Sequence, residues 1–266
     1  MKHALDFLIH PQPTDSTCGP TCLHSVYRYW GDSLSLEQTI REIGELSSGG
    51  TLAVQLACHA LQRGYQATLY SYNLQLFDPT WFSVPEVNLA AKLDQQLVSK
   101  GAQSGRGDLE QERLRVSTRS YLEFLRLGGE IRMPVLDENL IVDTLLQGRP
   151  ILCGLSATFL YRECRERGHA LETPSSTSVP DDTGGDPVGH FVVLYGYDRA
   201  KAQVLIADPL LSNPLGQEHT YAASLAKVSA AIFLGIVTYD ANLLTISPRH
   251  YLPGVQDGHH PCHGQE

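Results

Sequence analysis

Apolar side chains at helical spacing follow a polar loop near the N-terminus. They are Cys22, Leu23, Val26, Tyr27 and Trp30. The loop before them ends in three good N-cap residues, Asp15 to Thr17, and Pro20 suits a first helical turn. Because these positions share one face at 3.6-residue spacing, the pattern predicts an amphipathic helix that begins close to Cys18.

Two more helices and a strand are predicted before residue 73. Ser35-Leu36-Glu37-Gln38 is a capping-box sequence, and the helix that it opens ends at Gly44. A further helix follows Gly49-Gly50-Thr51 and ends at Gly64. The pattern over Tyr65 to Tyr72 then favours a strand.

The pattern changes between residues 73 and 129. Two helical stretches are predicted there, from Glu86 to Lys100 and from Asp108 to Leu127, separated by a glycine-rich segment at 101–107. Amphipathic helices normally bury their apolar stripe. We therefore interpret residues 73–129 as a helical insertion that packs on the rest of the chain.

The second half alternates strand and helix signals and then turns to strands. The predicted strands cover Glu130 to Pro134 and Pro150 to Leu155, and the predicted helices cover Asp137 to Leu146 and Phe159 to Arg167. Glu172 to Gly189 is a long loop rich in Ser, Pro, Asp and Gly. We interpret it as a mobile, solvated loop, although a loop just before a catalytic residue could also cover a substrate cleft.

The composition excludes some classes of partner. Of the 266 residues, 42% are hydrophobic, as in an ordinary folded protein. The formal net charge is −9 and there is no Lys/Arg run, which argues against nucleic acid or an anionic membrane as the main partner. No signal peptide and no run of about 18 apolar residues is evident. We expect a cytoplasmic protein without a membrane span, and the oligomeric state stays open.

The six cysteines lack the spacing of a disulfide framework, as expected of reduced thiols. Cys18 stands out because the start of a helix favours thiolate over thiol, and a thiolate attacks carbonyl groups. Gln12, six residues upstream, could direct an amide N–H at a developing oxyanion. The alternative is that Cys18 is a buried, inert residue, as most cysteines are.

A histidine and an aspartate stand at the ends of two predicted strands. Gly189 to Asp198 and Gln203 to Pro209 are expected to form an antiparallel hairpin that turns at residues 199–202. His190 and Asp208 then lie on one face at the same end, within reach of each other. With Cys18 they supply a nucleophile, a base and an orienting acid. For either residue alone, an ordinary strand end is the simpler interpretation.

Three motifs resemble one known family. They are Gln-(five residues)-Cys-Gly-Pro-Thr-Cys-Leu at Gln12 to Leu23, Gly-His-Phe-Val-Val-Leu at Gly189 to Leu194, and Ala-Asp-Pro at Ala207 to Pro209. They look like those of the papain-like, C39-like cysteine peptidases of the bacteriocin-processing type, which cut leader peptides after a double glycine, and of their free-standing relatives. The family's best-known members are cytosolic domains of ABC transporters, whereas this sequence has no nucleotide-binding motif.

The resemblance implies an α+β, papain-like fold, in which N-terminal helices pack on a C-terminal antiparallel sheet. A single domain is expected over residues 1–240, with the 73–129 insertion inside it, and residues 241–266 are expected to be a poorly ordered tail. By resemblance, Cys18 is the nucleophile, His190 the general base, Asp208 its orienting residue and Gln12 the oxyanion donor.

The sequence therefore predicts a cysteine-dependent hydrolase that cleaves a peptide or amide bond through a thioester, with a peptide or protein as substrate. One alternative is a non-catalytic peptide-binding module on the same fold. Another is an acyltransferase or amidase that acts on a peptide-like modification.

No cofactor or metal is expected. Cys22 lies one helical turn after Cys18, but without a second ligand pair this is weak evidence for zinc. The tail segment His259-His260-Pro261-Cys262-His263 crowds ligands that transition metals prefer, and a tail without function is the alternative. Glycine-rich pieces lack the context of phosphate loops.

Overall fold

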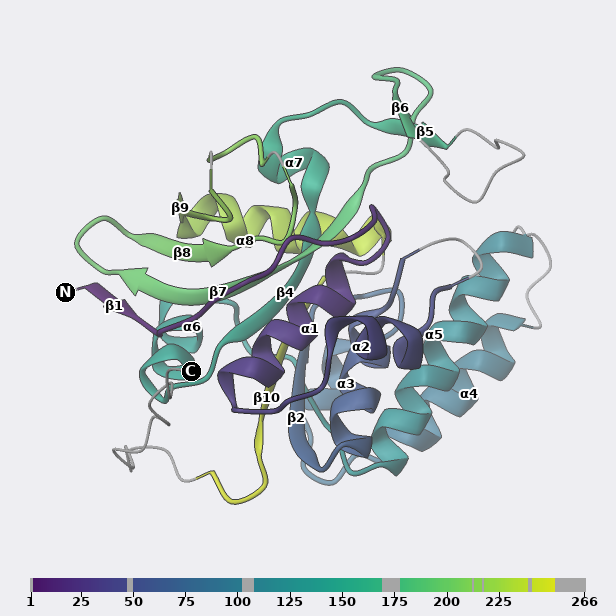
Figure 1. The fold of residues 1–266 in the computed structure, drawn as a ribbon. Coiled ribbons are helices and arrows are strands. Elements are labelled where there is room, and N and C mark those ends of the chain that lie inside the picture. The colour runs from purple at the N-terminus through teal and green to yellow at the C-terminus, as the bar shows by residue number, and fades with distance from the viewer. Residues whose placement is uncertain are drawn as a thin grey trace.

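A computed structural model describes residues 2–46, 50–101, 108–168, 178–211, 213–216, 218–238 and 241–251. In that part of the chain, helices lie on both sides of one large mixed sheet (Figure 1). The α+β class predicted from the sequence is confirmed.

The elements follow one another along the chain with short connections. The strands are β1 (Lys2–Ala4), β2 (Tyr65–Ser71), β3 (Glu130–Arg132), β4 (Ile151–Ser156), β5 (Glu166–Gly168), β6 (Ser178–Pro180), β7 (Gly189–Asp198), β8 (Gln203–Ala207), β9 (Thr220–Ser224) and β10 (Asn242–Pro248). The helices are α1 (Cys18–Tyr29), α2 (Leu36–Ile43), α3 (Ala53–Gln62), α4 (Leu89–Gly101), α5 (Asp108–Arg126), α6 (Glu138–Leu146), α7 (Ala157–Tyr161) and α8 (Leu225–Leu234), with 3-10 turns η1 (Pro79–Phe82) and η2 (Gly235–Thr238).

The large sheet has the strand order β3-β2-β10-β4-β7-β8-β9. Strand β1 pairs with the C-terminal end of β7. Its pairs are antiparallel except for β2 with β3, which is parallel. The long strand β7 joins the two halves, because β4 pairs along one edge of it and β8 along the other. Strands β5 and β6 form a separate two-stranded sheet.

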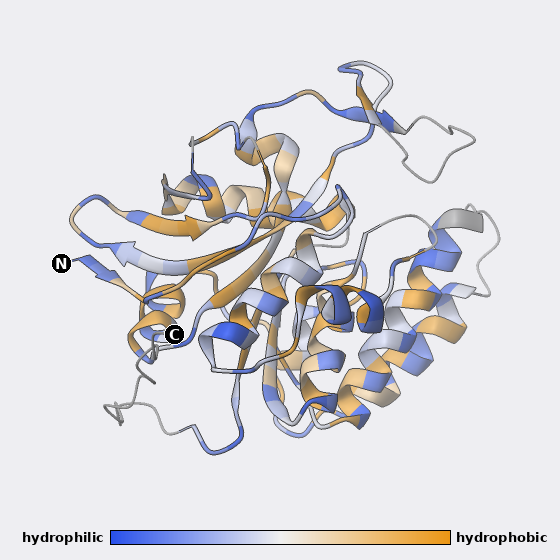
Figure 2. Cartoon of the chain, viewed as in Figure 1, coloured by the Kyte–Doolittle hydropathy of each residue, from blue (hydrophilic) through white to orange (hydrophobic). Residues whose placement is uncertain are grey.

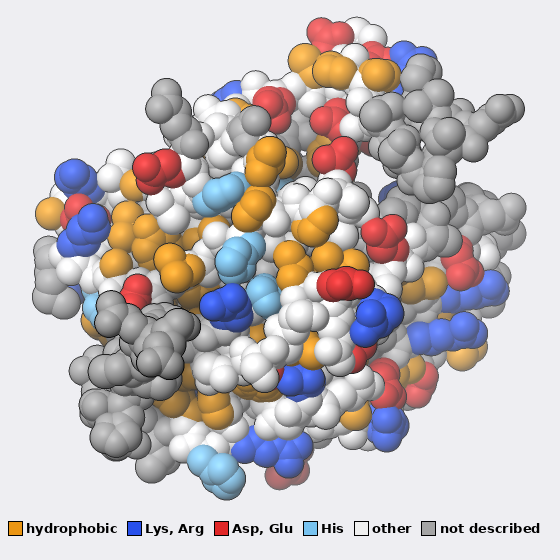
Figure 3. All heavy atoms as spheres, in the orientation of Figure 1, with side chains coloured by type: hydrophobic (Ala, Val, Ile, Leu, Met, Phe, Trp, Pro, Cys, Tyr) orange, Lys and Arg blue, Asp and Glu red, His pale blue; other side chains and the backbone are white. Residues whose placement is uncertain are grey.

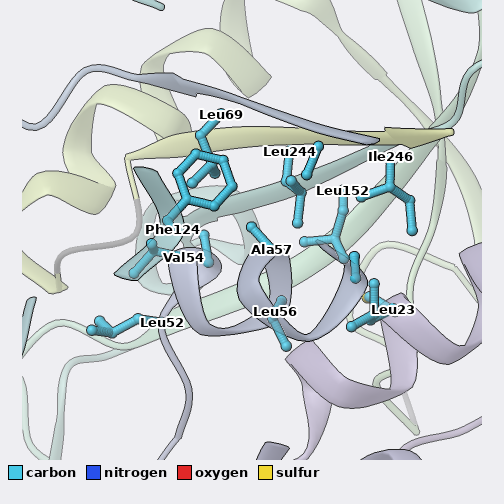
Figure 4. Packing of buried hydrophobic residues seen from close by; sticks show 14 of the residues in the cluster. Leu23, Leu52, Val54, Leu56, Ala57, Leu69, Phe124, Leu152, Leu244 and Ile246 are labelled. Carbon is cyan, nitrogen blue, oxygen red and sulfur yellow. The ribbon is translucent and has the colours of Figure 1, made fainter. Parts of the chain in front are cut away.

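Each face of the sheet buries its own hydrophobic cluster. One cluster joins α1, α3 and α5 to the sheet, and the other joins it to α6, α7 and α8. Figure 4 shows Ala57 of α3 facing Leu152 of β4 and Leu244 of β10 in the first cluster, while Leu56 points from the other side of α3. The central strands and α8 are correspondingly rich in hydrophobic residues (Figure 2). The strands are covered on both faces, which explains their long apolar runs.

Local signals predicted several element boundaries well. Helix α1 begins at Cys18, and the Ser35 side chain accepts a hydrogen bond from Gln38 N at the start of α2, as a capping residue does. The strand predicted from residue 189 to 198 is β7. The 73–129 region holds η1, α4 and α5, and α5 packs on α3. No helix in the described ranges is long and apolar enough to span a bilayer.

One helix prediction was too long. The stretch from Phe159 to Arg167 is helical only to Tyr161, and Arg162 follows with a left-handed backbone (φ 63°). Residues 166–168 then pair as β5 with β6, which belongs to the segment predicted as a solvated loop. Residues 172–177 of that loop lie outside the described residues.

The boundary expected for a C-terminal tail was wrong. Residues 242–248 form β10, which lies inside the sheet between β2 and β4. Its side chains face both hydrophobic clusters, so this strand completes the core rather than trailing from it. The histidine-rich segment at 259–263 lies outside the described residues.

We predict that Leu244→Ala lowers the free energy of unfolding by about 2–5 kcal/mol, because Leu244 is 1% exposed and its loss leaves a cavity. Urea denaturation followed by circular dichroism measures this change. Leu8→Ala is the control, since Leu8 is 78% exposed and its truncation should cost less than about 0.5 kcal/mol. Equal effects of the two changes would contradict the central position of β10.

Candidate active site

The Cys18 side chain starts α1 and is 8% exposed. A tight turn holds the chain before it: the Thr17 hydroxyl donates to Thr14 O at 2.9 Å, and Thr14 N donates back to that hydroxyl at 3.1 Å. The Thr17 side chain therefore bonds within the loop and makes no capping hydrogen bond to α1. These bonds fix the loop before the helix, which places the Cys18 thiol at the helix N-terminus.

The start of α1 packs closely on β7. A Cβ added at Gly19 would lie 3.1 Å from the Phe191 ring and 3.2 Å from Leu56, so a larger residue would require these side chains to shift by a few tenths of an ångström. Cys22, one turn further on, donates its S–H to Phe191 O at 3.3 Å. These contacts bring Cys18 to the end of β7 that carries His190.

His190 and Asp208 meet at the ends of β7 and β8. Val193 pairs with Ala207, so the two strands bring these residues to the same end of the hairpin. His190 Nε2 donates to Asp208 Oδ1 at 2.9 Å, and both side chains are buried. The bond with Asp208 occupies Nε2 and leaves Nδ1 for a second partner. Cys18 lies near enough to raise the pKa of His190, so the thiol, the imidazole and the carboxylate gather at one strand end.

Electrostatics favour a charged His190–Asp208 pair. Burial lowers the pKa of His190, but the hydrogen bonds with Asp208 and Cys18 outweigh burial and raise the pKa from 6.5 to about 10. Burial alone would raise the pKa of Asp208, yet the hydrogen bond and charge of His190 bring it below its ordinary value. Both shifts point to an imidazolium next to a carboxylate at neutral pH.

The proton on His190 also contributes to stability. A folded-state pKa of about 10 against 6.5 for the free side chain means that this contribution is complete below about pH 6.5. It is lost as the pH rises through about 10, because the folded state then releases the proton that it had held.

Three neighbours of Asp208 were not predicted from the sequence. Asp208 Oδ2 accepts hydrogen bonds from Tyr161 OH at 2.6 Å, Asn213 Nδ2 at 2.8 Å and Tyr221 OH at 2.8 Å. Leu210 N donates to Oδ1 at 3.0 Å. No local motif marks these residues. The pairing of β9 with β8 brings Tyr221 to Asp208, the loop between these strands brings Asn213, and Tyr161 comes from α7.

Gln12 lies beside the same strand end. Its backbone N–H donates to Pro209 O at 2.8 Å, which ties it to the residue after Asp208. Its side-chain amide donates to Thr14 O at 3.0 Å, and among the described residues Oε1 is buried without a partner. The structure thus brings Gln12 to the site through its backbone, while its amide points into the loop that carries Cys18.

The other cysteines differ from Cys18 in their surroundings. Burial, followed by the nearby Cys18 and Asp208, raises the pKa of Cys22 well above its ordinary value. Burial likewise raises the pKa of Cys58 to about 12. Cys164 is exposed, and each of these cysteines is free of disulfide bonding. Among the described cysteines, Cys18 is the one that raises the pKa of His190.

A cavity of about 460 Å³ lies beside the end of β4, and none of the four candidate site residues lines it. Its lining residues are Ser156, Thr158, Phe159, Arg162, Glu163, Arg165, Pro187, Leu234 and Val237. Leu155 pairs with His190 and Ser156 with Gly189, so the cavity adjoins the strand end that carries the histidine. On the face drawn in Figure 3, histidine side chains gather among hydrophobic ones near its centre.

Comparisons with known proteins find similarity only among solved structures. No protein-family model and no curated protein matches the chain. A protein from Bacillus anthracis described as a "putative C39-like peptidase" is 14% identical, with 94% of this chain and 98% of that chain covered and a TM-score of 0.48. The peptidase domain of Streptococcus ComA, a bifunctional ABC transporter, is 13% identical (91% and 99% covered, TM-score 0.39).

Xylellain, a cysteine protease from Xylella fastidiosa, is 15% identical, with 92% of this chain and 85% of that chain covered and a TM-score of 0.41. All three are peptidases, the class that the sequence motifs resemble.

We predict that the His190 imidazole still carries two protons at pH 8, and that its titration midpoint lies near 10. NMR of ¹⁵N-histidine-labelled protein measures this, with the resonance assigned by its loss in His190→Gln. Asp208→Asn should bring the midpoint back toward 6.5 or below, because the carboxylate no longer stabilises the cation. A wild-type midpoint at or below 6.5 would contradict the charged pair.

Proposed function

We propose that this protein is a cysteine-dependent hydrolase that cleaves a peptide or amide bond through a thioester on Cys18. The observation that carries the proposal is the His190–Asp208 hydrogen bond of 2.9 Å at the ends of β7 and β8, together with the nearby Cys18 thiol, which raises the pKa of His190. A nucleophile, a base and an orienting acid in contact are the arrangement that covalent acyl transfer needs.

The first half of the reaction forms the thioester. His190 holds the proton of the pair, and Cys18 attacks the carbonyl carbon as the thiolate. The carbonyl π electrons move onto oxygen, where the second amide hydrogen of Gln12 and the backbone N–H of Cys18 stabilise the negative charge. His190 then gives its proton to the nitrogen as the C–N bond breaks. The amine leaves, and the acyl group stays on sulfur.

The second half releases the acid. Water attacks the thioester carbonyl while His190 accepts one of its protons. The C–S bond then breaks, and sulfur leaves as the thiolate beside the imidazolium. Asp208 remains ionised throughout and holds the ring so that Nδ1 faces the reaction.

The cavity beside β4 supports a peptide as the substrate class. Its volume of about 460 Å³ lies in the range of ligand pockets, and Phe159, Leu234 and Val237 give it apolar walls next to charged groups. A substrate side chain bound there would lie next to the strand end that carries His190.

We predict that Cys18→Ala lowers turnover of a cleavable peptide by roughly 10⁴-fold or more, because no other group can form the acyl-enzyme. A synthetic peptide library, with products identified by mass spectrometry, supplies the substrate. Cys58→Ala is the control and should keep wild-type turnover, since this cysteine lies on α3, where its thiol donates to Ser120 O. Full turnover by the Cys18→Ala protein would end the proposal.

Gln12→Ala should lower kcat by roughly 10²–10³-fold and leave KM nearly unchanged, because an oxyanion donor acts mainly in the transition state. Steady-state kinetics on the peptide found in the library measure both constants. Gln62→Ala, a change at an exposed residue of α3, controls for the loss of an amide. A rise in KM with unchanged kcat would assign Gln12 to substrate binding instead.

A further inference from the structure

The Asp208 carboxylate is enclosed by hydrogen-bond donors. Oδ2 accepts hydrogen bonds from Tyr161 OH, Asn213 Nδ2 and Tyr221 OH. Oδ1 accepts hydrogen bonds from His190 Nε2 and Leu210 N. The donors come from α7, β7, β9 and the loop after β8. Asp208 itself is fully buried, at 0% exposure. Segments far apart in the sequence thus converge on one carboxylate.

This arrangement fits only the ionised form of the acid. An ionised carboxylate accepts hydrogen bonds at about four lone-pair sites and donates none. The Asn213 amide is itself fixed, because its Oδ1 accepts from Leu215 N at 2.8 Å and so turns Nδ2 toward Asp208. A protonated Asp208 would need an acceptor in a place where the surrounding groups donate.

The two tyrosines remain donors at any working pH. Burial, followed by the charge of Asp208, raises the pKa of Tyr161 and of Tyr221 above the ordinary value. Tyr161 also lies beside His190, with ring centroids 6.0 Å apart and planes tilted by 56°. It therefore both anchors the carboxylate and covers the imidazole that bonds to it.

We propose that Tyr161, Asn213 and Tyr221 are positioning residues that hold Asp208 in the orientation in which Oδ1 meets His190, and that they thereby keep the Cys18–His190 pair reactive. The inference rests on the proposed function. Three donors on Oδ2 leave Oδ1 to face the imidazole, and without them the carboxylate can rotate or take up a proton. A purely structural role would tie α7 and β9 to the sheet without affecting the reactivity of Cys18.

The titratable groups around Asp208 set the direction of the expected change. They are Cys18 and Cys22 on α1, Tyr161 on α7, His190 on β7, His219 before β9, and Tyr221 on β9. Donors to an ionised carboxylate lower its pKa, so removal of a donor raises it. Asp208 then becomes protonated at a higher pH. The acid limb of the pH profile, where the reactivity of Cys18 falls as the pH is lowered, should therefore move to higher pH.

The test is the rate of Cys18 alkylation by iodoacetamide between pH 4 and pH 9, read by peptide mass spectrometry. Tyr161→Phe and Tyr221→Phe each remove one hydroxyl and keep the ring. We expect each to move the acid limb to higher pH and to lower the rate at the acid end of the range, near pH 4, roughly tenfold. Both hydroxyls donate to the same oxygen of Asp208. The fold reduction in alkylation rate in the Tyr161→Phe/Tyr221→Phe double variant should therefore differ from the product of the two single reductions.

Tyr65→Phe is the matched control, since Tyr65 OH donates to the carboxylate of Asp32 at 3.2 Å, away from Cys18. Its profile should coincide with that of the wild type. Asn213→Ser removes the third donor from a loop and serves if a tyrosine variant fails to fold, as judged by thermal unfolding. Unchanged profiles in folded Tyr161→Phe, Tyr221→Phe and Asn213→Ser proteins would overturn the inference.

The same experiment tests separately whether Cys18 is an activated nucleophile and whether the neighbours of Asp208 position it. If wild-type Cys18 reacts no faster than the exposed Cys164, the proposed function fails. If wild-type Cys18 reacts fast and the variants keep its pH profile, the proposed function stands and only the positioning role is lost.

Discussion

The structure around the candidate site depends on one buried carboxylate. An isolated charge in a protein interior costs far more free energy than a fold can supply, so Asp208 must be paired and fully hydrogen-bonded. It meets this requirement with His190 and four neutral donors. Because these donors belong to different elements, the requirement of one side chain fixes how α7, β7, β9 and the loop after β8 fit together.

The second constraint is the close approach of α1 to the sheet. Gly19 allows the helix N-terminus to rest on Phe191, and the loop before it is fixed by Thr14 and Thr17. The thiol is thereby held near His190, whose pKa it raises. Since β4 and β8 flank β7 and β10 fills the gap between β4 and β2, the site rests on the rigid centre of the sheet.

The residues of the site were predictable where their signals are local. Cys18 follows from cap residues and apolar spacing, and the approach of His190 to Asp208 follows from a hairpin with a short turn. Tyr161, Asn213 and Tyr221 were not predictable, because they meet Asp208 only through tertiary packing. Residues 242–248 were assigned to a tail for the same reason: their place between β2 and β4 depends on pairing with distant strands, which no local pattern encodes.

The most direct test of acyl transfer at Cys18 is the reaction with p-nitrophenyl acetate, followed by absorbance and by mass spectrometry of the peptides. We expect a burst of nitrophenolate of about one equivalent, with the acetyl group on Cys18, because acyl-enzyme forms faster than water releases it. His190→Ala should remove the burst. Slow acetylation without a burst, spread over several cysteines and unaffected by His190→Ala, would contradict a nucleophile activated by His190.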